Sequence, residues 1–208
     1  CTTYNKRNAI FNCSMGFVKR EIIFSESVYS SFIKDDLFNH DLINYFTNEK
    51  NKNPKRLNTS AKGGYRSEDV PLNVSFIPVL KKHLYIFLKE SFDIDNFKIQ
   101  SAWFVENLKG HFNVKHNHPE AHLSGVYYLK APKNCGDIVF FRDDKLVEYL
   151  DLYNYLEPNS DHYVNYSITP EKSKLIVFPA HLSHQVNPNQ SDDARLCFGF
   201  NIKLFRKK

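Results

Sequence analysis

The stretch RLCFGFNIKLF, residues 195–205, alternates between apolar side chains and polar or small ones. Successive side chains of a β-strand point to opposite faces, so the alternation gives the strand two different sides. The apolar side consists of Leu196, Phe198, Phe200, Ile202 and Leu204. The other side consists of Arg195, Cys197, Gly199, Asn201 and Lys203. The apolar side needs a covering layer, whereas an Arg and an Asn separated by small residues suit the lining of a polar pocket.

Several shorter runs of strand-like sequence precede this one, separated by turn-forming residues. They cover residues 98–107, 111–115, 123–130, 136–142, 165–169 and 174–178. Short strands at such spacing predict a mainly β fold of the sandwich, barrel or jelly-roll type. An aromatic content of 15%, with 18 Phe and 12 Tyr, agrees with this prediction because aromatic residues are enriched in strands.

The chain before residue 97 has helical periodicity instead. Apolar residues spaced three to four apart predict helix over residues 19–49 and again over residues 75–92. Residues 51–64 are polar, with Pro54 and a Gly-Gly pair, and predict a loop. We therefore predict a single domain, residues 1–208, in which a largely helical part (1–96) packs on a β-rich part (97–208).

Composition narrows the class of protein. The 208 residues carry a formal charge of +5, and a hydrophobic content of 42% indicates a globular chain. The basic residues are spread out, which favours a small-molecule or peptide substrate over nucleic acid. Four cysteines without C-x-x-C spacing favour a reducing, cytoplasmic setting, and no apolar run approaches the roughly 20 residues of a membrane span. The sequence does not indicate an oligomeric state.

Four of the nine histidines lie in GHFNVKHNHPEAHLSGVYYL, residues 110–129. His116 and His118 would project to the same side of an extended segment, as two ligands of one metal should. A third ligand is available in residues 174–188, where a strand-like run is followed by His181 and His184. We prefer His184, because Arg195 follows it after eleven residues and opens the strand described above.

This order of residues predicts a metal site with a fixed cation beside it. Neutral imidazoles suit iron, zinc or copper, and an arginine binds a carboxylate through its planar fork. An iron site beside a carboxylate-binding Arg195 is what an oxygenase with a 2-oxo acid cosubstrate needs. The alternative role for this arginine is a structural salt bridge with Asp192 or Asp193.

These segments resemble motifs of the prolyl-hydroxylase-like 2-oxoglutarate, Fe(II)-dependent oxygenases. The pattern G-x-x-N-x-x-H-x-H of residues 110–118 resembles their Gly-x-Tyr-x-x-His-x-Asp segment. The segment that contains Phe178, His184 and Arg195 resembles the segment of these oxygenases that holds the second iron-binding histidine and the arginine for 2-oxoglutarate. More narrowly, N-x-x-H-x-H-P, L-S-G-V-Y-Y-L and L-x-H-x-V-x-P-N are similar to a family of such oxygenases from marine bacteria and their phages. The resemblance covers most of the chain.

The resemblance implies a double-stranded β-helix (jelly-roll, cupin-like) core covered by the N-terminal helices. It implies Fe(II), 2-oxoglutarate and O2 as cofactors, and hydroxylation of an unidentified polar substrate with release of succinate and CO2. His116, His118 and His184 would bind the metal. Arg195 would bind the far carboxylate of 2-oxoglutarate. Further candidates for contact with 2-oxoglutarate or for the pocket lining are Tyr128, Asn113 and Asn201.

Position 118 departs from the superfamily pattern, which has Asp or Glu there. His118 could replace the carboxylate and complete a three-histidine site, and the His-x-His-Pro pattern of the narrower family favours this interpretation. Alternatively, His118 and Glu120 form the ligand pair, since H-P-E is itself His-x-Glu. In a third interpretation the carboxylate position is empty and open to a halide, as in related halogenases.

Two functions of other classes stay open beside the oxygenase. One is a cupin-like protein that binds a metal or a small acid without turnover, and the other is a zinc hydrolase with three histidines and water. The zinc hydrolase has no need of a carboxylate clamp at Arg195. We expect residues 51–64 and 143–163 to form the walls of the substrate site, because loops on a rigid barrel carry specificity.

Overall fold

The computed structural model describes residues 26–55, 59–142 and 165–206. Two helices and eleven strands make up this part of the chain. In chain order they are β1 (Tyr29–Phe32), α1 (Asp36–Lys52), β2 (Ala61–Lys62), β3 (Tyr65–Arg66), α2 (Phe76–Phe92), β4 (Phe97–Asn107), β5 (Phe112–His116), β6 (Leu123–Lys130), β7 (Ile138–Phe141), β8 (Asn165–Ile168), β9 (Lys174–Pro179), β10 (His184–Val186) and β11 (Arg195–Leu204).

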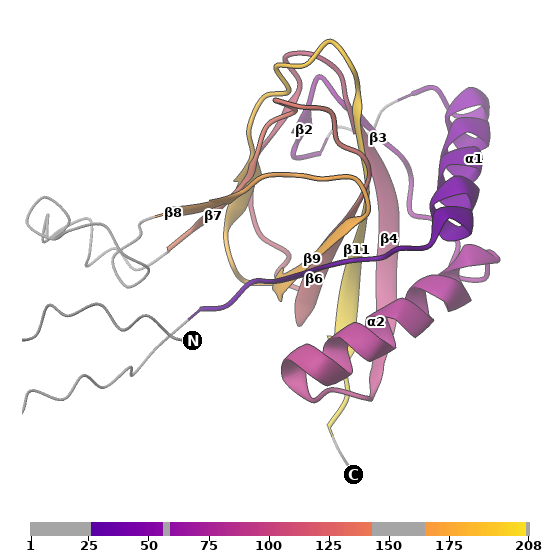
Figure 1. Ribbon diagram of the computed structural model, residues 1–208, viewed down its shortest axis with the longest axis vertical. Helices are drawn as coiled ribbons and strands as arrows, with labels where there is room; N and C mark the ends of the chain where they lie inside the picture. Colours follow the sequence, from indigo (N-terminus) through magenta and orange to yellow (C-terminus); the bar gives the residue numbers. More distant parts are fainter. Residues whose placement is uncertain (1–25, 56–58, 143–164, 207–208) are drawn as a thin grey trace, which may run out of the picture.

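The strands form two antiparallel sheets that face each other (Figure 1). The larger sheet has the order β1-β9-β6-β11-β4-β3, and the smaller has the order β2-β5-β10-β7-β8. Strands alternate between the two sheets from β4 to β7 and again from β8 to β11. This is the double-stranded β-helix that the family resemblance implies.

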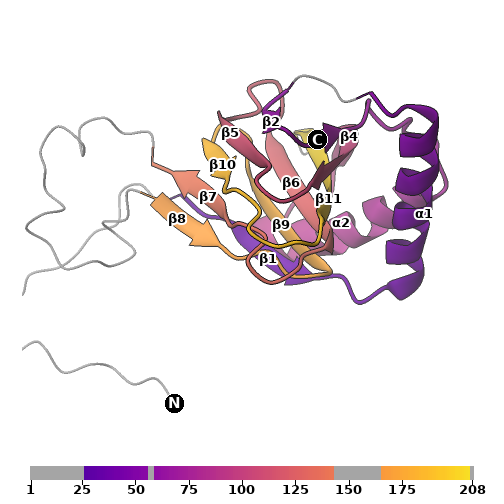
Figure 2. The same ribbon diagram turned by 90° about the horizontal axis from the view of Figure 1, so that it is seen from above.

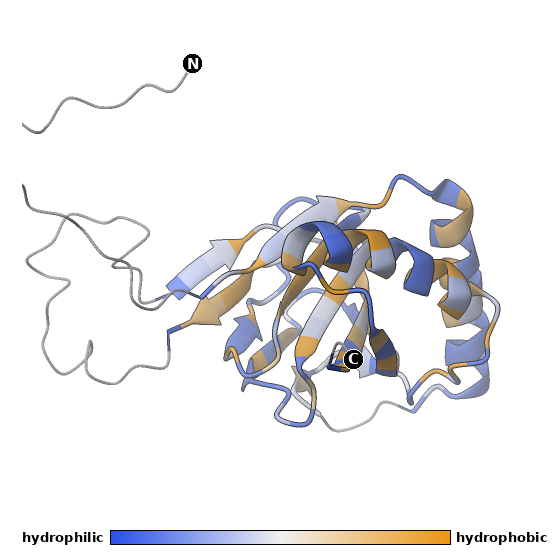
Figure 3. Ribbon diagram, turned by 90° about the horizontal axis from the view of Figure 1, so that it is seen from below, coloured by the Kyte–Doolittle hydropathy of each residue, from blue (hydrophilic) through white to orange (hydrophobic). Residues whose placement is uncertain are grey.

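Both helices cover the outer face of the larger sheet (Figures 1 and 2). The apolar side of β11 packs under them, and Phe198, Phe200 and Ile202 are fully buried in one core with Leu80 and Leu84 of α2. Figure 3 shows hydrophobic and hydrophilic residues in turn along both helices, as expected where one face packs and the other meets water. The predicted two-sided character of β11 is confirmed.

The helix predictions were right in one place and partly wrong in the other. The helix expected over residues 75–92 is α2, Phe76–Phe92. Of the helix expected over 19–49, residues 19–25 lie outside the described ranges, and Tyr29–Phe32 forms strand β1 at the edge of the larger sheet. Pairing with β9 and the packing of Tyr29 on Phe92, with ring centroids 4.3 Å apart, outweigh the local helical periodicity. Helix α1 begins after Asp35, whose Oδ1 accepts the Phe38 N–H at 2.9 Å.

The N-terminal part does more than cover the barrel. Its strands β2 and β3 join the two sheets at one end, where β2 pairs with β5 and β3 pairs with β4. The loop expected over 51–64 therefore contains the end of α1 and the strand β2. This arrangement brings Ser60 and Arg66 to the cavity described below. Within the described ranges, neither helix is long and apolar enough to cross a membrane.

Candidate metal centre and ligand pocket

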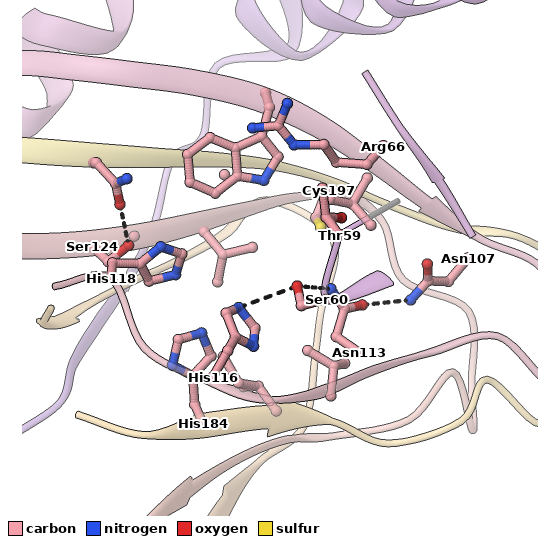
Figure 4. A pocket seen from close by; sticks show the side chains of 18 of the residues that line it. Thr59, Ser60, Arg66, Asn107, Asn113, His116, His118, Ser124, His184 and Cys197 are labelled. Carbon is pink, nitrogen blue, oxygen red and sulfur yellow. Dashed lines mark hydrogen bonds between the residues drawn. The ribbon is translucent and has the colours of Figure 1, made fainter. Parts of the chain in front are cut away.

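A cavity of about 390 Å³ lies between the two sheets, within the size range usual for small-molecule sites. Its wall on the larger sheet is the polar side of β11 together with the facing residues of β4 and β6. Three histidines from the smaller sheet and its continuation, His116, His118 and His184, point into it (Figure 4).

The sheet pairing brings the three imidazoles together. His116 at the end of β5 pairs with His184 at the start of β10. His118 follows β5, and its N–H donates to the Ala180 carbonyl at 2.8 Å. The ring centroids lie 4.4 Å apart for His116 and His184, and one ligand nitrogen from each of the three residues falls within 4.8 Å of the others. The three side chains form the metal-binding candidate of the described residues.

Backbone carbonyls orient two of the imidazoles. The Nδ1 atom of His116 lies 2.7 Å from the Val114 carbonyl oxygen, and that of His184 lies 3.0 Å from the Leu182 carbonyl oxygen. Because a carbonyl oxygen only accepts, Nδ1 carries the proton in both rings and Nε2 keeps its lone pair. This is the arrangement that outer contacts impose on histidines that bind a metal.

Burial keeps the three imidazoles neutral. It lowers the pKa of His116, lowers that of His118 to about 4 and lowers that of His184 to about 3. The charge of the neighbouring His116 lowers the last two pKa values further. Three neutral imidazoles with converging lone pairs fit a divalent transition metal.

Two other candidates for ligation lie elsewhere. Glu120 is exposed in the turn after His118 and does not belong to the histidine group. Its carbonyl oxygen accepts from Lys203 Nζ at 3.2 Å. His181 is also exposed, and its Nε2 lies 3.1 Å from Glu26 Oε1. Of the two histidines after β9, only His184 points into the cavity.

Arg195 is a buried cation at one end of the same cavity, with 2% of its surface exposed. Its Nη1 donates to the carbonyl oxygens of Cys135, Gly136 (2.9 Å) and Asn187 (3.4 Å). Within the described ranges, no carboxylate forms a salt bridge with its guanidinium. The alternative role in a salt bridge with Asp192 or Asp193 is therefore wrong, and Asp192 pairs instead with Lys109 at 2.7 Å.

A chain of polar side chains joins Arg195 to the histidines, and Figure 4 shows its part from Asn107 through Asn113 and Ser60 to His116. The Asn107 amide lies 2.5 Å from Arg195 Nη2 and 3.0 Å from the Asn113 amide. The Asn113 amide in turn lies 3.3 Å from Ser60 Oγ, which is 3.4 Å from His116 Nε2. Because a guanidinium only donates, Nη2 donates to the side-chain oxygen of Asn107.

The remaining predicted contacts divide between the two ends of the cavity. Tyr128 and Asn113 lie near Arg195, and burial raises the pKa of the Tyr128 phenol, which therefore stays protonated. Asn201 is six residues from Arg195 along β11, which is about 20 Å at 3.3 Å per residue. A five-carbon acid bound at Arg195 does not reach that far, so Asn201 belongs to the opposite end.

Some residues of the pocket escaped the sequence reasoning. Asn107 and Trp103 face the cavity from β4, and Ser60 and Arg66 face it from the segment before α2. The alternation of β4 gave a signal for the first two, since Trp103, Val105 and Asn107 share one side. The positions of Ser60 and Arg66 depend on pairing with distant strands, which local pattern does not reveal. The predicted wall at 143–163 lies outside the described residues.

Comparison with known proteins agrees with this geometry. Residues 101–201 match a family model described as "Putative 2OG-Fe(II) oxygenase". The match spans the strands that supply the three histidines and Arg195. Residues 101–201 are thus similar to members of the 2OG-Fe(II) oxygenase superfamily. The cofactors of that superfamily are Fe(II), 2-oxoglutarate and O2.

Solved structures of 2OG-Fe(II) oxygenases share the fold of this chain. A prolyl-4-hydroxylase from Pseudomonas putida has 14% identity and a TM-score of 0.60, with 87% of this chain and 95% of that chain covered. The viral collagen prolyl hydroxylase of Paramecium Bursaria Chlorella virus-1, a 2-oxoglutarate complex, has 17% identity and a TM-score of 0.57, with 86% and 96% covered. HygX from Streptomyces hygroscopicus, with nickel and 2-oxoglutarate bound, has 8% identity and a TM-score of 0.63, with 86% and 83% covered. At these identities the likeness concerns the fold alone. No curated protein matches the sequence.

Proposed function

We propose that this protein is a 2OG-Fe(II) oxygenase that hydroxylates a small-molecule or peptide substrate. In the proposed reaction the substrate, 2-oxoglutarate and O2 give hydroxylated substrate, succinate and CO2. One oxygen atom of O2 enters the substrate and the other enters succinate. His116, His118 and His184 are the proposed metal ligands, and Arg195 is the proposed partner of the distal carboxylate.

The observation that carries this proposal is the state of Arg195. A buried cation without a counter-ion is costly, and carbonyl dipoles compensate its charge only in part. In the described part of the chain Arg195 has hydrogen-bond acceptors but no carboxylate. A ligand carboxylate would supply the missing charge, in a cavity that also holds three neutral imidazoles. A three-histidine zinc hydrolase gives no reason for such an arginine.

The bound iron and cosubstrate would supply oxygen activation, and the chain would supply position and protection. Tyr128, with its phenol protonated, can donate a hydrogen bond to an anionic ligand beside Arg195. Asn113 can hold the same region through its amide, which also contacts Asn107. Apolar residues around this end, including Ile138 and Phe178, exclude water from the reacting groups.

The three-histidine donor set has a consequence for binding order. Three neutral imidazoles leave the full dipositive charge on the metal, whereas a usual triad with a carboxylate leaves one positive charge less. Fe(II) should therefore bind weakly alone and more tightly with 2-oxoglutarate, because the dianion restores the missing negative charge.

Anaerobic titration of Fe(II) into the protein with 2-oxoglutarate tests the proposal through the visible metal-to-ligand charge-transfer band. We expect the band in the wild type, its weakening in Arg195→Ala and Arg195→Lys, and its loss in His118→Ala. Glu120→Ala is the matched control, because Glu120 is exposed outside the histidine group, and it should keep the band. Circular dichroism of each variant separates loss of ligand binding from loss of fold.

The opposite result would identify one of the other classes. A protein that binds iron or zinc but shows no band with 2-oxoglutarate would contradict the oxygenase proposal. Hydrolysis of ester substrates by the zinc form would then favour the hydrolase, and metal binding without turnover would favour a cupin-like binding protein. Loss of the band in Glu120→Ala would refute the three-histidine ligand set while leaving the oxygenase proposal intact.

A further inference from the structure

The cavity has a second end, opposite Arg195, where Trp103 forms part of the wall. A Cβ atom added at Gly199 would lie 2.8–3.0 Å from three atoms of the Trp103 ring. Three such similar distances mean that the indole lies with its face over the β11 backbone, where only glycine leaves room. The ring centroids of Trp103 and His118 are 5.7 Å apart. Trp103 is thus a flat surface directly beside the histidine group.

Arg66 of β3 lies against the same indole. The Cζ atom of Arg66 is 5.1 Å from the centroid of the Trp103 ring, within the range of a cation–π contact. Its Nη1 donates to the Ser67 carbonyl at 2.7 Å, and its Nη2 donates to Asp69 Oδ1 at 2.7 Å. These bonds use two of the five N–H groups of a guanidinium and fix its position. None of the residues that the structure describes accepts a hydrogen bond from the other N–H groups, so these can bind a ligand in the cavity.

The charge of the cavity wall is one-sided. The described residues that line it include two arginines and neither Asp nor Glu. Asp69, the partner of Arg66, does not line the cavity, and its side chain is 56% exposed to water. Solvent therefore screens that carboxylate more than it screens Arg66, whose side chain is 18% exposed. Both charged side chains among the described residues that line the cavity are therefore cations.

A row of neutral polar groups completes this end. Ser124 Oγ donates to Asn201 Oδ1 at 2.7 Å, and Asn201 Nδ2 donates to Ser101 Oγ at 3.2 Å. The row crosses three neighbouring strands, β6, β11 and β4, on the cavity side. It can accept from and donate to a polar substrate without adding charge.

We propose that Arg66 and Trp103 form an anion site for the primary substrate, which carries a carboxylate or phosphate group. The anionic group binds the remaining N–H groups of Arg66, next to the Trp103 ring that holds this guanidinium in place. His118, in contact with the same ring, then places the metal centre beside the remainder of the substrate. The Ser101, Asn201 and Ser124 row gives orientation, and cationic substrates such as a lysine side chain are excluded. The anion site stands on its own geometry, and its role as a substrate site rests on the proposed oxygenase function.

The single tryptophan of the chain makes the anion site measurable without cofactor or substrate. Fluorescence quenching of metal-free protein by iodide, caesium and acrylamide reports how anions, cations and neutral molecules reach Trp103. We expect iodide to quench more strongly than caesium in the wild type. In Arg66→Gln the iodide-to-acrylamide ratio should fall about two- to fourfold, the Coulomb factor for one charge 5.1 Å away in water after salt screening.

Two variants control this measurement. Arg66→Lys keeps the charge and should retain most of the iodide preference. Lys98 is exposed, lies outside the cavity and belongs to β4, the strand of Trp103. Lys98→Gln removes one positive charge there and should leave the iodide-to-acrylamide ratio unchanged. An unchanged ratio in Arg66→Gln, or an equal fall in Lys98→Gln, would overturn the anion site.

A second measurement tests the link to the substrate. Formation of succinate from 2-oxoglutarate should be stimulated by members of a panel of carboxylic acids, amino acids and phosphorylated compounds, and not by amines. Arg66→Gln should raise the KM for the stimulating compound at least tenfold while leaving the Fe(II)–2-oxoglutarate charge-transfer band unchanged. Stimulation by amines alone would overturn the proposed substrate class. Absence of that band would instead contradict the oxygenase function, which the quenching result does not depend on.

Discussion

Replacing Asn189 by alanine removes a fully buried side chain that ties two turns together beside Arg195. Its Nδ2 donates to the carbonyl oxygens of Asn107, at 2.9 Å, and Asp193, at 2.8 Å. Its Oδ1 accepts from the Ser191 N–H at 2.8 Å. Asn107 ends β4 and Asp193 precedes β11, so one amide joins the end of one strand to the approach of its neighbour.

The expected cost follows from these three bonds. Each buried group that loses its hydrogen-bond partner lowers the free energy of unfolding by about 1–3 kcal/mol. The three costs do not add fully, because the structure relaxes around neighbouring groups together. We therefore expect Asn189→Ala to lower the free energy of unfolding by roughly 3–5 kcal/mol. This is a large part of the total for a domain, which is typically about 5–15 kcal/mol.

Urea unfolding of the wild type and the variant measures this difference. With a slope of about 2 kcal/mol per molar urea, the midpoint should fall by roughly 2 M. Gln190→Ala is the matched control, since Gln190 is exposed and its backbone N–H bond to Asn134 survives the change. It should shift the free energy of unfolding by no more than about 0.5 kcal/mol. A loss below about 1 kcal/mol in Asn189→Ala would refute the reasoning that this amide holds the two turns.

Three further predictions concern the cavity. Gly199→Ala should push Trp103 off the β11 backbone, cost about 1–3 kcal/mol of stability and shift the Trp103 emission maximum; an unchanged spectrum would contradict the packing. Burial lowers the pKa of His184 to about 3, so the unfolded chain takes up a proton at this residue before the folded chain does. His184 alone should therefore cost the metal-free protein roughly 2 kcal/mol of stability as pH falls from the unfolded pKa of about 6.5 to pH 5, in addition to the loss from His118. His184→Gln should flatten that part of a pH series of urea unfolding, and an equally steep series would count against it. His118→Asp should bind Fe(II) without 2-oxoglutarate about tenfold more tightly, measured by anaerobic titration, whereas Asn117→Asp, an exposed control, should not.

Local pattern predicted much of the fold because its strands and one helix have clear two-sided sequences. In β11 every second residue from Leu196 to Ile202 is apolar and buried. In α2 the apolar stripe includes Leu80, Leu84 and Leu88, which are all fully buried. Local sequence pattern did not predict the strands that are short or that pair with distant parts of the chain. The four residues of β1 and the three of β10 owe their conformation to strands more than 40 residues away in sequence.

The candidate site was predictable to the extent that its chemistry is local. His116 and His118 lie two residues apart, and His184 precedes Arg195 in one short segment, so their types and spacing indicated a metal beside a cation. Asn201 and Arg195 share one side of β11, but six residues of strand separate them by about 20 Å, so a shared side did not mean a shared ligand. Arg66, which no motif marked, enters the cavity only through the pairing of β3 with β4.

The polar chain from Arg195 to the histidines gives the arginine a role beyond its charge. A guanidinium only donates, so the Asn107 oxygen faces Arg195, and the Asn113 atom 3.0 Å from that oxygen must be its amide nitrogen. The Asn113 oxygen then faces Ser60, which donates its single hydroxyl proton to it across 3.3 Å. Ser60 therefore has no proton left for His116 Nε2 at 3.4 Å. The lone pair of that nitrogen stays available to the metal, so the donor-only chemistry of the cation at one end of the cavity favours the ligand form of a histidine in its middle.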